Sequence, residues 1–372
     1  MKFTCTRDNL LRGLHVASGI AMKPSNLPIL SHIYIRAQES GVSLLSTNLE
    51  LAVTAQVRAK VEQPGGFTVP AKTLLDYVTL LRDEQITLSL EGAQVIIHSS
   101  GSSTKIKGDG PDEYPVIPSM TRQFDVVIET QALKEAFSNV MFAAAKNEIR
   151  PELSGIFCSF FAKETKEVVF AATDSYRLSE SKIMLAHMQE EKQCIIPART
   201  VAEFVRLLGV IASETKTVTL SLGEGQISLR TDDIDMMSRL IDGNYPDYRQ
   251  IIPTQFQTTA EISKDAFINS VKAASLFSHA GVNAISLSID AQKKHCRISS
   301  TSAQTGEHAS EIDAEALGEG GSVLLNYRYV LEGVQHIEDD ILECKMNSAD
   351  SPCIFKAKSS DDFTYIVMPI RQ

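Results

Sequence analysis

Apolar residues with helical spacing recur in three separate stretches of the chain. In the first stretch, Leu10, Leu14 and Ala17 follow the i, i+4, i+7 spacing of one helix face. Short strand-like segments precede all three stretches, at residues 2–5, 125–129 and 259–263. The pattern predicts a strand followed by an amphipathic helix, three times over, with Thr130 and Ser263 at N-cap positions. The equivalent stripes are Leu133, Phe137, Val140 and Ala144 in the second stretch, and Phe267, Val271 and Ala274 in the third.

A second element recurs later in each block. Residues 69–78 (VPAKTLLDYV) closely match residues 196–205 (IPARTVAEFV), and residues 325–331 (LNYRYVL) are a looser version. Each copy predicts a strand, a turn and a short helix. Residues 86–98 and 218–229 predict β-hairpins, with Gly92 turning the first hairpin and Gly223 and Gly225 the second.

The two elements repeat at a distance of roughly 125 to 130 residues, which is far above the period of solenoid repeats. The chain therefore contains duplications of a whole domain, and we expect an α+β fold with three tandem copies of a two-helix unit. Pro118 and Pro253 mark the junctions, so the expected domains are residues 1–120, 121–254 and 255–372.

Composition agrees with a multidomain globular protein. The chain has 372 residues, of which 43% are hydrophobic and 22% charged. There is no apolar run of about eighteen residues and no apolar signal-peptide core after Met1, so we expect no membrane span and a cytoplasmic location. The six cysteines are scattered without a Cys-x-x-Cys pair, which favours buried thiols over disulfides or a zinc site. The net charge of −10 argues against a generally basic nucleic-acid coat, but it permits a local basic surface.

Catalytic motifs are missing from the sequence. It has no phosphate-binding loop, dinucleotide fingerprint, His-Glu-x-x-His helix or Gly-x-Ser-x-Gly elbow. The glycine-rich residues 318–321 lack a following Lys-Ser/Thr and are interpreted as a flexible turn. Asp232, Asp233 and Asp235 could bind a metal ion, or they could form a solvated turn between strands. We expect no enzyme activity, no cofactor and no metal.

Four segments are the most specific motifs: residues 27–30 (LPIL), 172–178 (ATDSYRL), 240–248 (LIDGNYPDY) and 365–371 (YIVMPIR). Together with the Pro-Ala-Lys and Pro-Ala-Arg repeats, and in this order over the whole chain, they resemble the bacterial sliding clamp family, the beta subunits of DNA polymerase III. The resemblance implies three copies of a two-helix, two-sheet clamp domain. It also implies a head-to-tail dimer that forms a six-domain ring around duplex DNA, with helices lining the hole.

The resemblance also implies which basic residues face DNA. Such contacts go to backbone phosphates and carry no base information, so DNA would be bound without sequence specificity. For any single residue, a solvated charge on a helix surface is the alternative interpretation. The candidates are Lys23, Lys72, Lys134, Lys146, Arg150, Arg199, Arg206, Lys264, Lys272 and Arg328.

A partner-peptide groove is implied between the second and third domains, next to the C-terminus. Ser175 and Tyr176 stand where the family most often has Gly and His, and Gln250 replaces a frequent Arg, so the preferred peptide could differ. Ordinary core packing is the alternative for Leu153, Leu178 and Ile366. The expected groove residues are Leu153, Thr173, Ser175, Tyr176, Arg177, Leu178, Pro246, Ile251, Ile366, Met368, Pro369, Ile370 and Arg371, with Asn326 and Tyr329 in a second subsite.

Ring closure is expected to join the strand around Thr104 and Ile106 to the helix end at Leu276 and Phe277, although core packing within one domain would also explain the last two.

The leading hypothesis is a processivity clamp that docks the replicative DNA polymerase, the clamp loader and other proteins with a clamp-binding motif. The rival hypotheses are a hydrolase on a triplicated scaffold, which would need a clustered catalytic set, and a clamp-like decoy that is no longer loaded on DNA.

Overall fold

The computed structural model describes residues 1–117, 120–147, 149–161, 165–186, 190–279 and 281–371. Pro118, where one domain junction is expected, lies outside these residues. Within them the chain forms two compact units, each described separately below. The first unit contains residues 1–134 and 199–240, and the second contains residues 135–198 and those from 241 onward.

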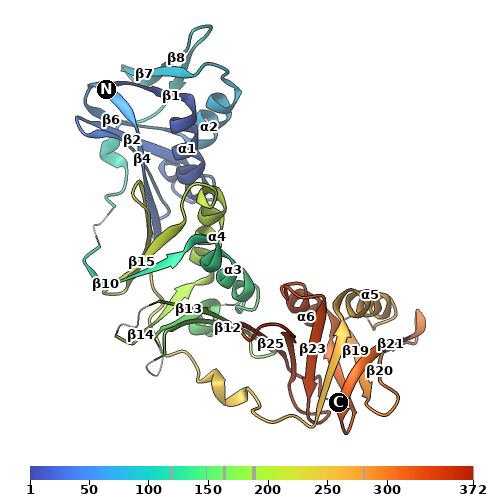
Figure 1. Cartoon of the computed structure of the whole chain (residues 1–372). Coiled ribbons are helices and arrows are strands. Elements are labelled where there is room, and N and C mark those ends of the chain that lie inside the picture. The colour runs from blue at the N-terminus through green and yellow to red at the C-terminus, as the bar shows by residue number, and fades with distance from the viewer. Residues whose placement is uncertain (118–119, 148, 162–164, 187–189, 280, 372) are drawn as a thin grey trace. The chain divides into compact units, whose positions relative to one another are not determined.

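The first repeat begins with a strand and a helix, as its apolar pattern predicts. Figure 1 shows α1 and α2 side by side next to the strands of this repeat. Its elements are β1 (Lys2–Thr6), α1 (Arg7–Ala21), the 3-10 turn η1 (Pro28–Ser31), β2 (His32–Gln38), β3 (Gly41–Thr47), β4 (Leu51–Val57), β5 (Ala59–Gln63), β6 (Gly65–Pro70), α2 (Ala71–Leu80), β7 (Gln85–Glu91), β8 (Gln94–His98), β9 (Ser103–Lys107) and η2 (Pro111–Glu113).

The second and third repeats follow the same order of helices and strands, except that a single strand (β13 or β21) stands where the first repeat has β4 and β5. The second contains β10 (Arg122–Glu129), α3 (Thr130–Met141), η3 (Pro151–Ser154), β11 (Gly155–Phe160), β12 (Glu167–Thr173), β13 (Arg177–Met184), β14 (Lys192–Pro197), α4 (Ala198–Ile211), β15 (Thr217–Gly223), β16 (Gln226–Arg230), β17 (Ile234–Arg239) and η5 (Tyr248–Ile251). The third contains β18 (Thr258–Ser263), α5 (Lys264–Ser275), β19 (Ala284–Asp290), β20 (His295–Ser302), β21 (Gly306–Gly318), β22 (Gly321–Asn326), α6 (Tyr327–Val334), β23 (Ile341–Met346), β24 (Cys353–Ala357) and β25 (Phe363–Val367). The described residues thus contain six α-helices, two in each repeat, and the expected α+β fold of three tandem copies is confirmed.

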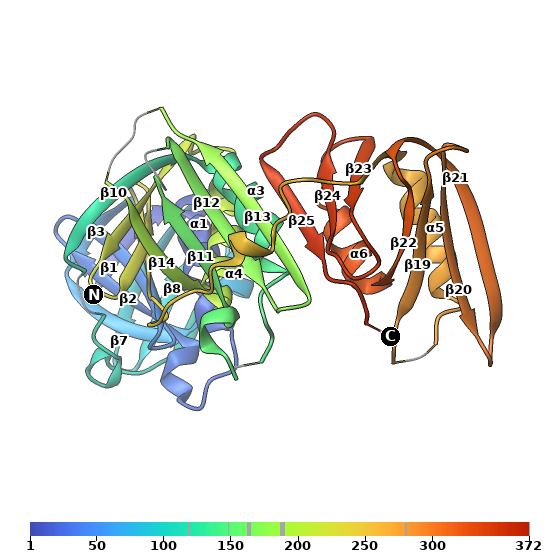
Figure 2. The same ribbon diagram turned by 90° about the horizontal axis from the view of Figure 1, so that it is seen from below.

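Strands of neighbouring repeats pair with each other and make the sheets continuous. In the first unit, β17 pairs antiparallel with β4 inside the sheet β10-β15-β16-β17-β4-β3-β2-β6, and a separate sheet has the order β5-β1-β7-β8-β9. In the second unit, β25 pairs antiparallel with β13 inside the sheet β14-β11-β12-β13-β25-β24-β23-β18-β21-β20-β19-β22. Figure 2 shows β25 between β24 and β13. The last strand of one repeat therefore extends the sheet of the preceding repeat at both internal junctions.

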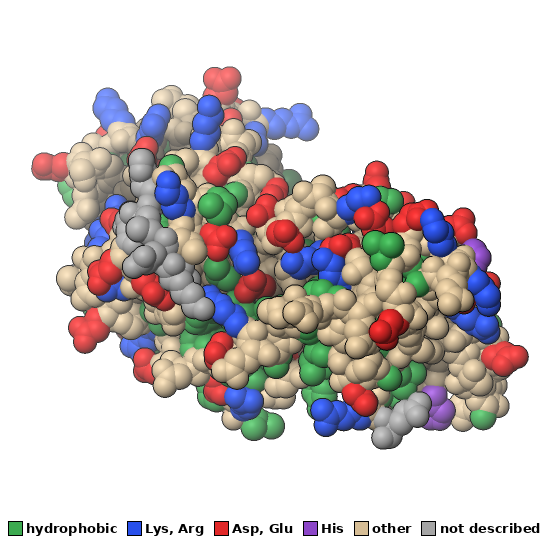
Figure 3. Space-filling model, turned by 60° about the horizontal axis from the view of Figure 1, so that its bottom comes forward, with side chains coloured by type: hydrophobic (Ala, Val, Ile, Leu, Met, Phe, Trp, Pro, Cys, Tyr) green, Lys and Arg blue, Asp and Glu red, His purple; other side chains and the backbone are tan. Residues whose placement is uncertain are grey.

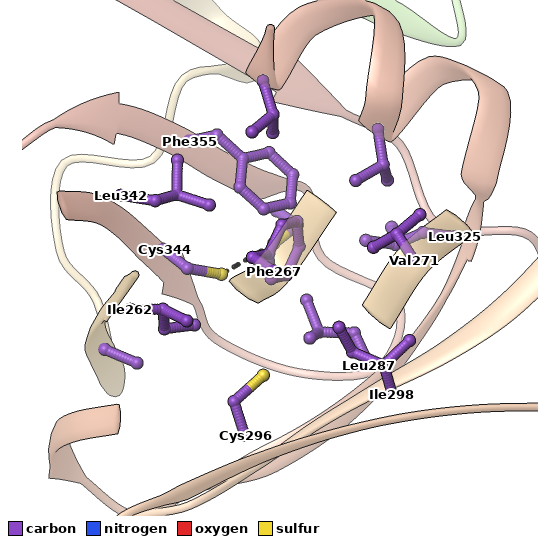
Figure 4. Close-up of a cluster of buried hydrophobic side chains, with 14 of the residues drawn as sticks. Ile262, Phe267, Val271, Leu287, Cys296, Ile298, Leu325, Leu342, Cys344 and Phe355 are labelled. Atoms are coloured by element: carbon purple, nitrogen blue, oxygen red, sulfur yellow. Dashed lines mark hydrogen bonds between the residues drawn. The ribbon is translucent and has the colours of Figure 1, made fainter. Parts of the chain in front are cut away.

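The apolar stripes lie in the cores, as their spacing predicts. Leu10, Leu14 and Ala17 of α1 are fully buried. In the third repeat, Phe267 and Val271 of α5 pack among Leu287, Ile298, Leu325 and Phe355 from the strands (Figure 4). Burial of each large apolar side chain stabilises the fold by about 1.5–3 kcal/mol.

The turns also follow the sequence pattern. Gly92 (φ 58°) lies in the turn from β7 to β8, and Gly225 (φ 63°) lies in the turn from β15 to β16. Glycine suits both positions because an L side chain is disfavoured in this left-handed region. Gly223 belongs to strand β15 and does not form the turn.

Of the two expected N-cap positions, that of Ser263 is confirmed and that of Thr130 is wrong. Thr130 is the first residue of α3, and its hydroxyl donates to the carbonyl of Thr215 while its N–H donates to the carbonyl of Lys216. Since the preceding strand runs directly into the helix, this hydroxyl is used to bind a neighbouring segment. Ser263 stands at the N-cap of α5 without a capping hydrogen bond. Among the helices, α1 is capped by the Thr6 side chain, which accepts from the Asn9 N–H, and α6 by the Asn326 side chain, which accepts from the Arg328 N–H.

The cysteines are free thiols, as expected, and all except the half-buried Cys194 are buried. Burial raises the pKa of Cys5 to about 12, which opposes thiolate formation.

Asp233 and Asp235 form ion pairs with Arg12 and Arg122, and the described residues show no group of three His, Cys, Asp or Glu side chains arranged for a metal. Within the described ranges, no helix is both long and apolar enough to cross a membrane.

Candidate functional site

A tight loop between β12 and β13 builds the centre of the candidate site. The Thr173 hydroxyl donates to the carbonyl of Arg177 (2.6 Å), and Asp174 Oδ1 accepts from the N–H groups of Tyr176 and Arg177. Ser175 has a left-handed backbone (φ 77°), and its N–H donates to Thr173 Oγ1. This turn leaves Tyr176 64% exposed while it directs Arg177 into the protein.

Arg177 is the best-connected side chain of the site. It is only 3% exposed, and Nε donates to Asp174 Oδ2 (3.0 Å) while Nη1 donates to Glu332. Nη2 donates to the carbonyl of Phe142 (2.7 Å), and the guanidinium lies 5.4 Å and 4.7 Å from the ring centres of Phe142 and Tyr329. Burial opposes the charged form, but the hydrogen bond to Glu332 and the surrounding negative charges outweigh it, so the pKa of Arg177 is raised.

A cavity of about 530 Å³ opens beside this arginine. Tyr176 stacks on Tyr329 at its mouth, with ring centres 6.5 Å apart. Four of the lining side chains are basic and two are acidic, in a chain whose net charge is −10. The lining residues are Ala145, Lys146, Asn147, Ile149, Arg150, Leu153, Asp174, Ser175, Tyr176, Arg177, Asn283, Asn326, Arg328, Tyr329 and Glu332.

The C-terminal segment runs between the Tyr176 loop and strand β22. The Met368 N–H donates to the carbonyl of Tyr176 (2.9 Å), and the Ile370 N–H donates to the carbonyl of Leu324 (2.8 Å). Met368, Pro369 and Ile370 are half-buried, and Arg371 is exposed. The backbone of this segment is therefore held at both sides while its apolar side chains stay partly accessible.

An apolar cluster supports the loop from behind. Leu178 and Ile366 are fully buried together with Phe157, Tyr248 and Ile354. The Thr173 N–H donates to the hydroxyl of Tyr245 (3.0 Å), and the Tyr248 hydroxyl donates to Glu180 (2.6 Å). Burial raises the pKa of both tyrosines, so both hydroxyls keep their protons. Pro246 and Ile251 lie close to Tyr248 of this cluster in the sequence. Pro246 is half-buried, and Ile251 is 41% exposed.

Sequence profiles decide the family. The profiles of the N-terminal, central and C-terminal domains of DNA polymerase III beta subunits match residues 1–118, 127–247 and 249–371. The chain belongs to the DNA polymerase III beta subunit family. The resemblance seen in the sequence is thereby confirmed.

Relatives of the same length share the family. A beta sliding clamp of Staphylococcus aureus is 27% identical in sequence to this chain, and the match covers all of this chain and 99% of the length of the Staphylococcus aureus protein. Among solved structures, the beta subunit of Thermotoga maritima has a TM-score of 0.92 at 27% identity, over all of this chain and 99% of its own. The sliding clamp of Bacillus subtilis has a TM-score of 0.91 at 25% identity with the same coverage.

The clamp-family groove prediction and the cavity overlap only in part. Leu153, Ser175, Tyr176, Arg177, Asn326 and Tyr329 line the cavity. The other expected groove residues lie in the supporting apolar cluster, beside it or in the C-terminal segment: Thr173, Leu178, Pro246, Ile251, Ile366, Met368, Pro369, Ile370 and Arg371. Gln250, which stands where the family frequently has Arg, donates to Asp247 (2.9 Å).

The expected DNA-facing residues have diverse surroundings. Lys146, Arg150 and Arg328 line the cavity, and Lys272 is exposed on α5. Several of the others are already engaged within the protein: Lys23 with Glu203, Lys72 with Asp76, Arg199 with Glu50, Arg206 with Glu203 and the carbonyls of His15 and Val16, and Lys264 with the carbonyl of Ile337. Lys134 is a half-buried residue of α3.

The expected ring-closing residues lie on the edge strand β9 and at the end of helix α5. Thr104 and Ile106 belong to β9, the last strand of its sheet, and Ile106 is buried. Leu276 is 72% exposed at the end of α5, and Phe277 stacks on His308 of β21 with ring centres 5.7 Å apart.

Sequence reasoning missed the partners of Arg177. Asp174 lies within a quoted motif and Glu332 follows Tyr329 by one helical turn, so both could have been found by asking which carboxylates neutralise a buried arginine. Nothing in the sequence indicates the contact of Phe142 with Arg177, because only the tertiary fold brings its carbonyl and its ring next to that arginine.

Proposed function

We propose that two copies of this chain close head to tail into a ring around duplex DNA and act as the processivity clamp of a replicative DNA polymerase. The observation that carries the proposal is the repeated junction. At both internal junctions, the last strand of one repeat pairs with the strand that follows the first hairpin of the preceding repeat, β17 with β4 and β25 with β13. A third junction of the same kind needs a strand from each end of the chain.

The two strands that would form it are open. Among the described residues, β9 pairs only with β8, and residues 306–313 of β21 pair only with β20. Lys105 and Lys107 are exposed on β9, and Glu307 and Glu311 are exposed on β21. Like charges oppose pairing of two identical edges, while opposite charges favour joining the two different edges. A head-to-tail ring is the arrangement that uses both edges in each of two chains.

The basic helix residues support passage of DNA through such a ring. Lys72, Arg199 and Arg328 are exposed on α2, α4 and α6, while the chain as a whole has a net charge of −10. Figure 3 shows basic and acidic side chains interspersed on the face that it draws. Weak contacts to phosphates from a few basic residues allow sliding, whereas a strongly basic surface would hold the DNA in place.

The cavity beside Arg177 supports the docking of partner proteins. Half-buried Met368 and Ile370, exposed Tyr176 and Ile149, and a few directional polar groups form a surface suited to a short peptide with apolar anchors. The polymerase, the clamp loader and other proteins with a clamp-binding motif would share this surface and therefore compete for it.

Retention on DNA tests the ring. Protein loaded by a clamp loader onto nicked circular DNA should stay bound in salt that abolishes ordinary phosphate binding, because release requires opening of the ring. Linearising the circle with a restriction enzyme should release it quickly through the free ends. The measurement is co-elution of labelled protein with DNA in gel filtration, before and after cutting. Equal retention on circular and linear DNA would contradict encirclement.

A further inference from the structure

The loop between β3 and β4 repeats the hydrogen bonds of the Tyr176 loop. The Thr47 hydroxyl donates to the carbonyl of Leu51 (3.0 Å), and the Leu49 N–H donates back to Thr47 Oγ1. Asn48 Oδ1 accepts from the N–H groups of Glu50 and Leu51. The third residue of both loops, Leu49 and Ser175, has the same left-handed φ of 77°. Residues 47–51 are thus the counterpart of residues 173–177.

The surroundings of the two loops correspond as well. The Arg239 N–H donates to the carbonyl of Glu50, as the Met368 N–H does to that of Tyr176. The 3-10 turns Pro28–Ser31 and Pro151–Ser154 are closed by the same bond from the serine hydroxyl to the proline carbonyl. In the match between residues 196–205 and 325–334, Arg199 and Glu203 take the places of Arg328 and Glu332. The first junction therefore contains a structural counterpart of the cavity region.

This counterpart presents aliphatic side chains to solvent. Leu49 is 53% exposed, and Met22 and Leu27 are 49% and 48% exposed. The equivalent positions of the second repeat hold Ser175 for Leu49, Ala145 for Met22 and Arg150 for Leu27. All three of these residues line the cavity of the second unit. A leucine in the left-handed region is uncommon, and its exposure means that core packing does not hold it there. The fold would be satisfied by glycine or asparagine at this position, so the leucine side chain calls for another explanation.

Ion pairs join these segments into one surface. Lys23, next to Met22, pairs with Glu203 (2.6 Å), and Glu50, next to Leu49, pairs with Arg199 (2.6 Å). Residues 199 and 203 lie one turn apart on α4, so the two loops flank the same turn of helix. Arg206, which pairs with Glu203, and exposed Arg239 add positive charge, so four basic residues accompany two acidic ones.

We propose that Met22, Leu27 and Leu49, with Lys23, Arg199 and Arg239 around them, form a second docking surface, which binds an extended acidic peptide with aliphatic anchors. The inference rests on the proposed function, in which the cavity beside Arg177 docks peptides. The second surface differs from that cavity in chemistry. Buried Leu51 replaces Arg177, and Thr200, bonded to Ser238, replaces Tyr329. Because these two positions supply neither a buried cation nor an aromatic ring, the second surface selects aliphatic side chains and carboxylates.

A fluorescein-labelled, end-blocked peptide of sequence Glu-Leu-Asp-Leu-Glu is the probe, titrated with the full chain and followed by anisotropy. Leu49→Gly removes the anchor contact and relieves the left-handed strain, so its melting temperature should equal or exceed that of the wild type. Its affinity for the probe should fall at least about fivefold. Ser175→Gly makes the same backbone change at the equivalent loop and should leave the affinity for this probe unchanged. Tyr176→Ala should also leave it unchanged.

Three outcomes overturn the proposal: unchanged probe binding in Leu49→Gly, equal loss in Tyr176→Ala, or full displacement of the probe by a short DNA duplex, which would make this a DNA surface. A second peptide, with one glutamine and two leucines, reports on the cavity. Its binding should be insensitive to Leu49→Gly and lost in Tyr176→Ala. Failure of this second peptide to bind the wild type would count against the proposed function, whereas failure of the acidic probe alone would count only against the second surface.

Discussion

At the scale of single residues, the site depends on a buried arginine whose charge is matched on all sides. Asp174, Glu332 and the Phe142 carbonyl accept its hydrogen bonds, and two aromatic rings cover its faces. The Asp174 carboxylate also holds the loop through two backbone N–H groups. Arg177 therefore couples the shape of the Tyr176 loop to helix α6.

Replacement of Arg177 tests this coupling. Arg177→Ala removes the donor to Asp174 Oδ2 and to the Phe142 carbonyl, and we expect it to lower the free energy of unfolding by about 3 kcal/mol. Urea unfolding followed by circular dichroism measures the change. Arg328→Ala is the matched control, since it removes an exposed arginine of the same cavity and should change stability by less than about 0.5 kcal/mol. Equal unfolding midpoints for the two variants would show that the contacts of Arg177 do not stabilise the fold.

At the scale of elements, local pattern predicts helices and turns well. The stripe of Leu10, Leu14 and Ala17 is buried, and the turns at Gly92 and Gly225 close their hairpins, because each depends on residues only a few positions apart. Thr130 shows where the same reasoning stops. Its hydroxyl binds the carbonyl of Thr215, 85 residues away, and no local rule predicts that competition.

The pairing of strands from neighbouring repeats could not be predicted from the sequence either. The periodicity of β4 or β17 shows which side chains of a strand face a core, but it does not show which strand lies at its edge. The cavity has the same origin, since its lining comes from four separate parts of the chain: residues 145–147, 149, 150 and 153; residues 174–177; Asn283; and residues 326, 328, 329 and 332. The family resemblance named six of these lining residues as groove residues and Lys146, Arg150 and Arg328 as DNA-facing residues, and the structure added the carboxylates that neutralise Arg177.

The open strands give a prediction at this scale. Lys105→Glu with Lys107→Glu reverses the charge of β9, so in the proposed ring this edge should repel Glu307 and Glu311 on β21 of the second chain. We expect the dimer to dissociate at least about tenfold more readily, since like charges brought together at an interface cost several kcal/mol. Analytical ultracentrifugation measures the dissociation constant. Glu307→Lys with Glu311→Lys, combined with the first pair of changes, should restore the dimer. A dimer unaffected by the first pair would place the interface elsewhere.

At the scale of the whole molecule, the proposed ring closure and the proposed partner docking would use separate parts of the chain. The open edges belong to β9 and to residues 306–313 of β21, while the cavity is lined by residues 145–147, 149, 150 and 153, by the Tyr176 loop and by residues of α6. A clamp has to stay closed on DNA while its partners exchange, and this separation allows it. The two activities should therefore respond to different mutations.

Deleting residues 369–372 tests that separation. The truncation keeps Met368 and its bond to Tyr176, but it removes Pro369, Ile370 and the bond from Ile370 to Leu324. Binding energy is concentrated in a few anchors, so we expect the affinity for a peptide with one glutamine and two leucines to fall by about 2 kcal/mol or more. The dimer should persist, because neither open edge is touched. Fluorescence anisotropy and sedimentation on the same sample measure both properties, with the Lys105→Glu, Lys107→Glu protein as the reciprocal control that loses the dimer and keeps the peptide. If the truncated protein stays folded and dimeric and binds the peptide at full strength, the C-terminal segment is not part of the docking surface. If it loses the dimer as well, docking and ring closure are not separate.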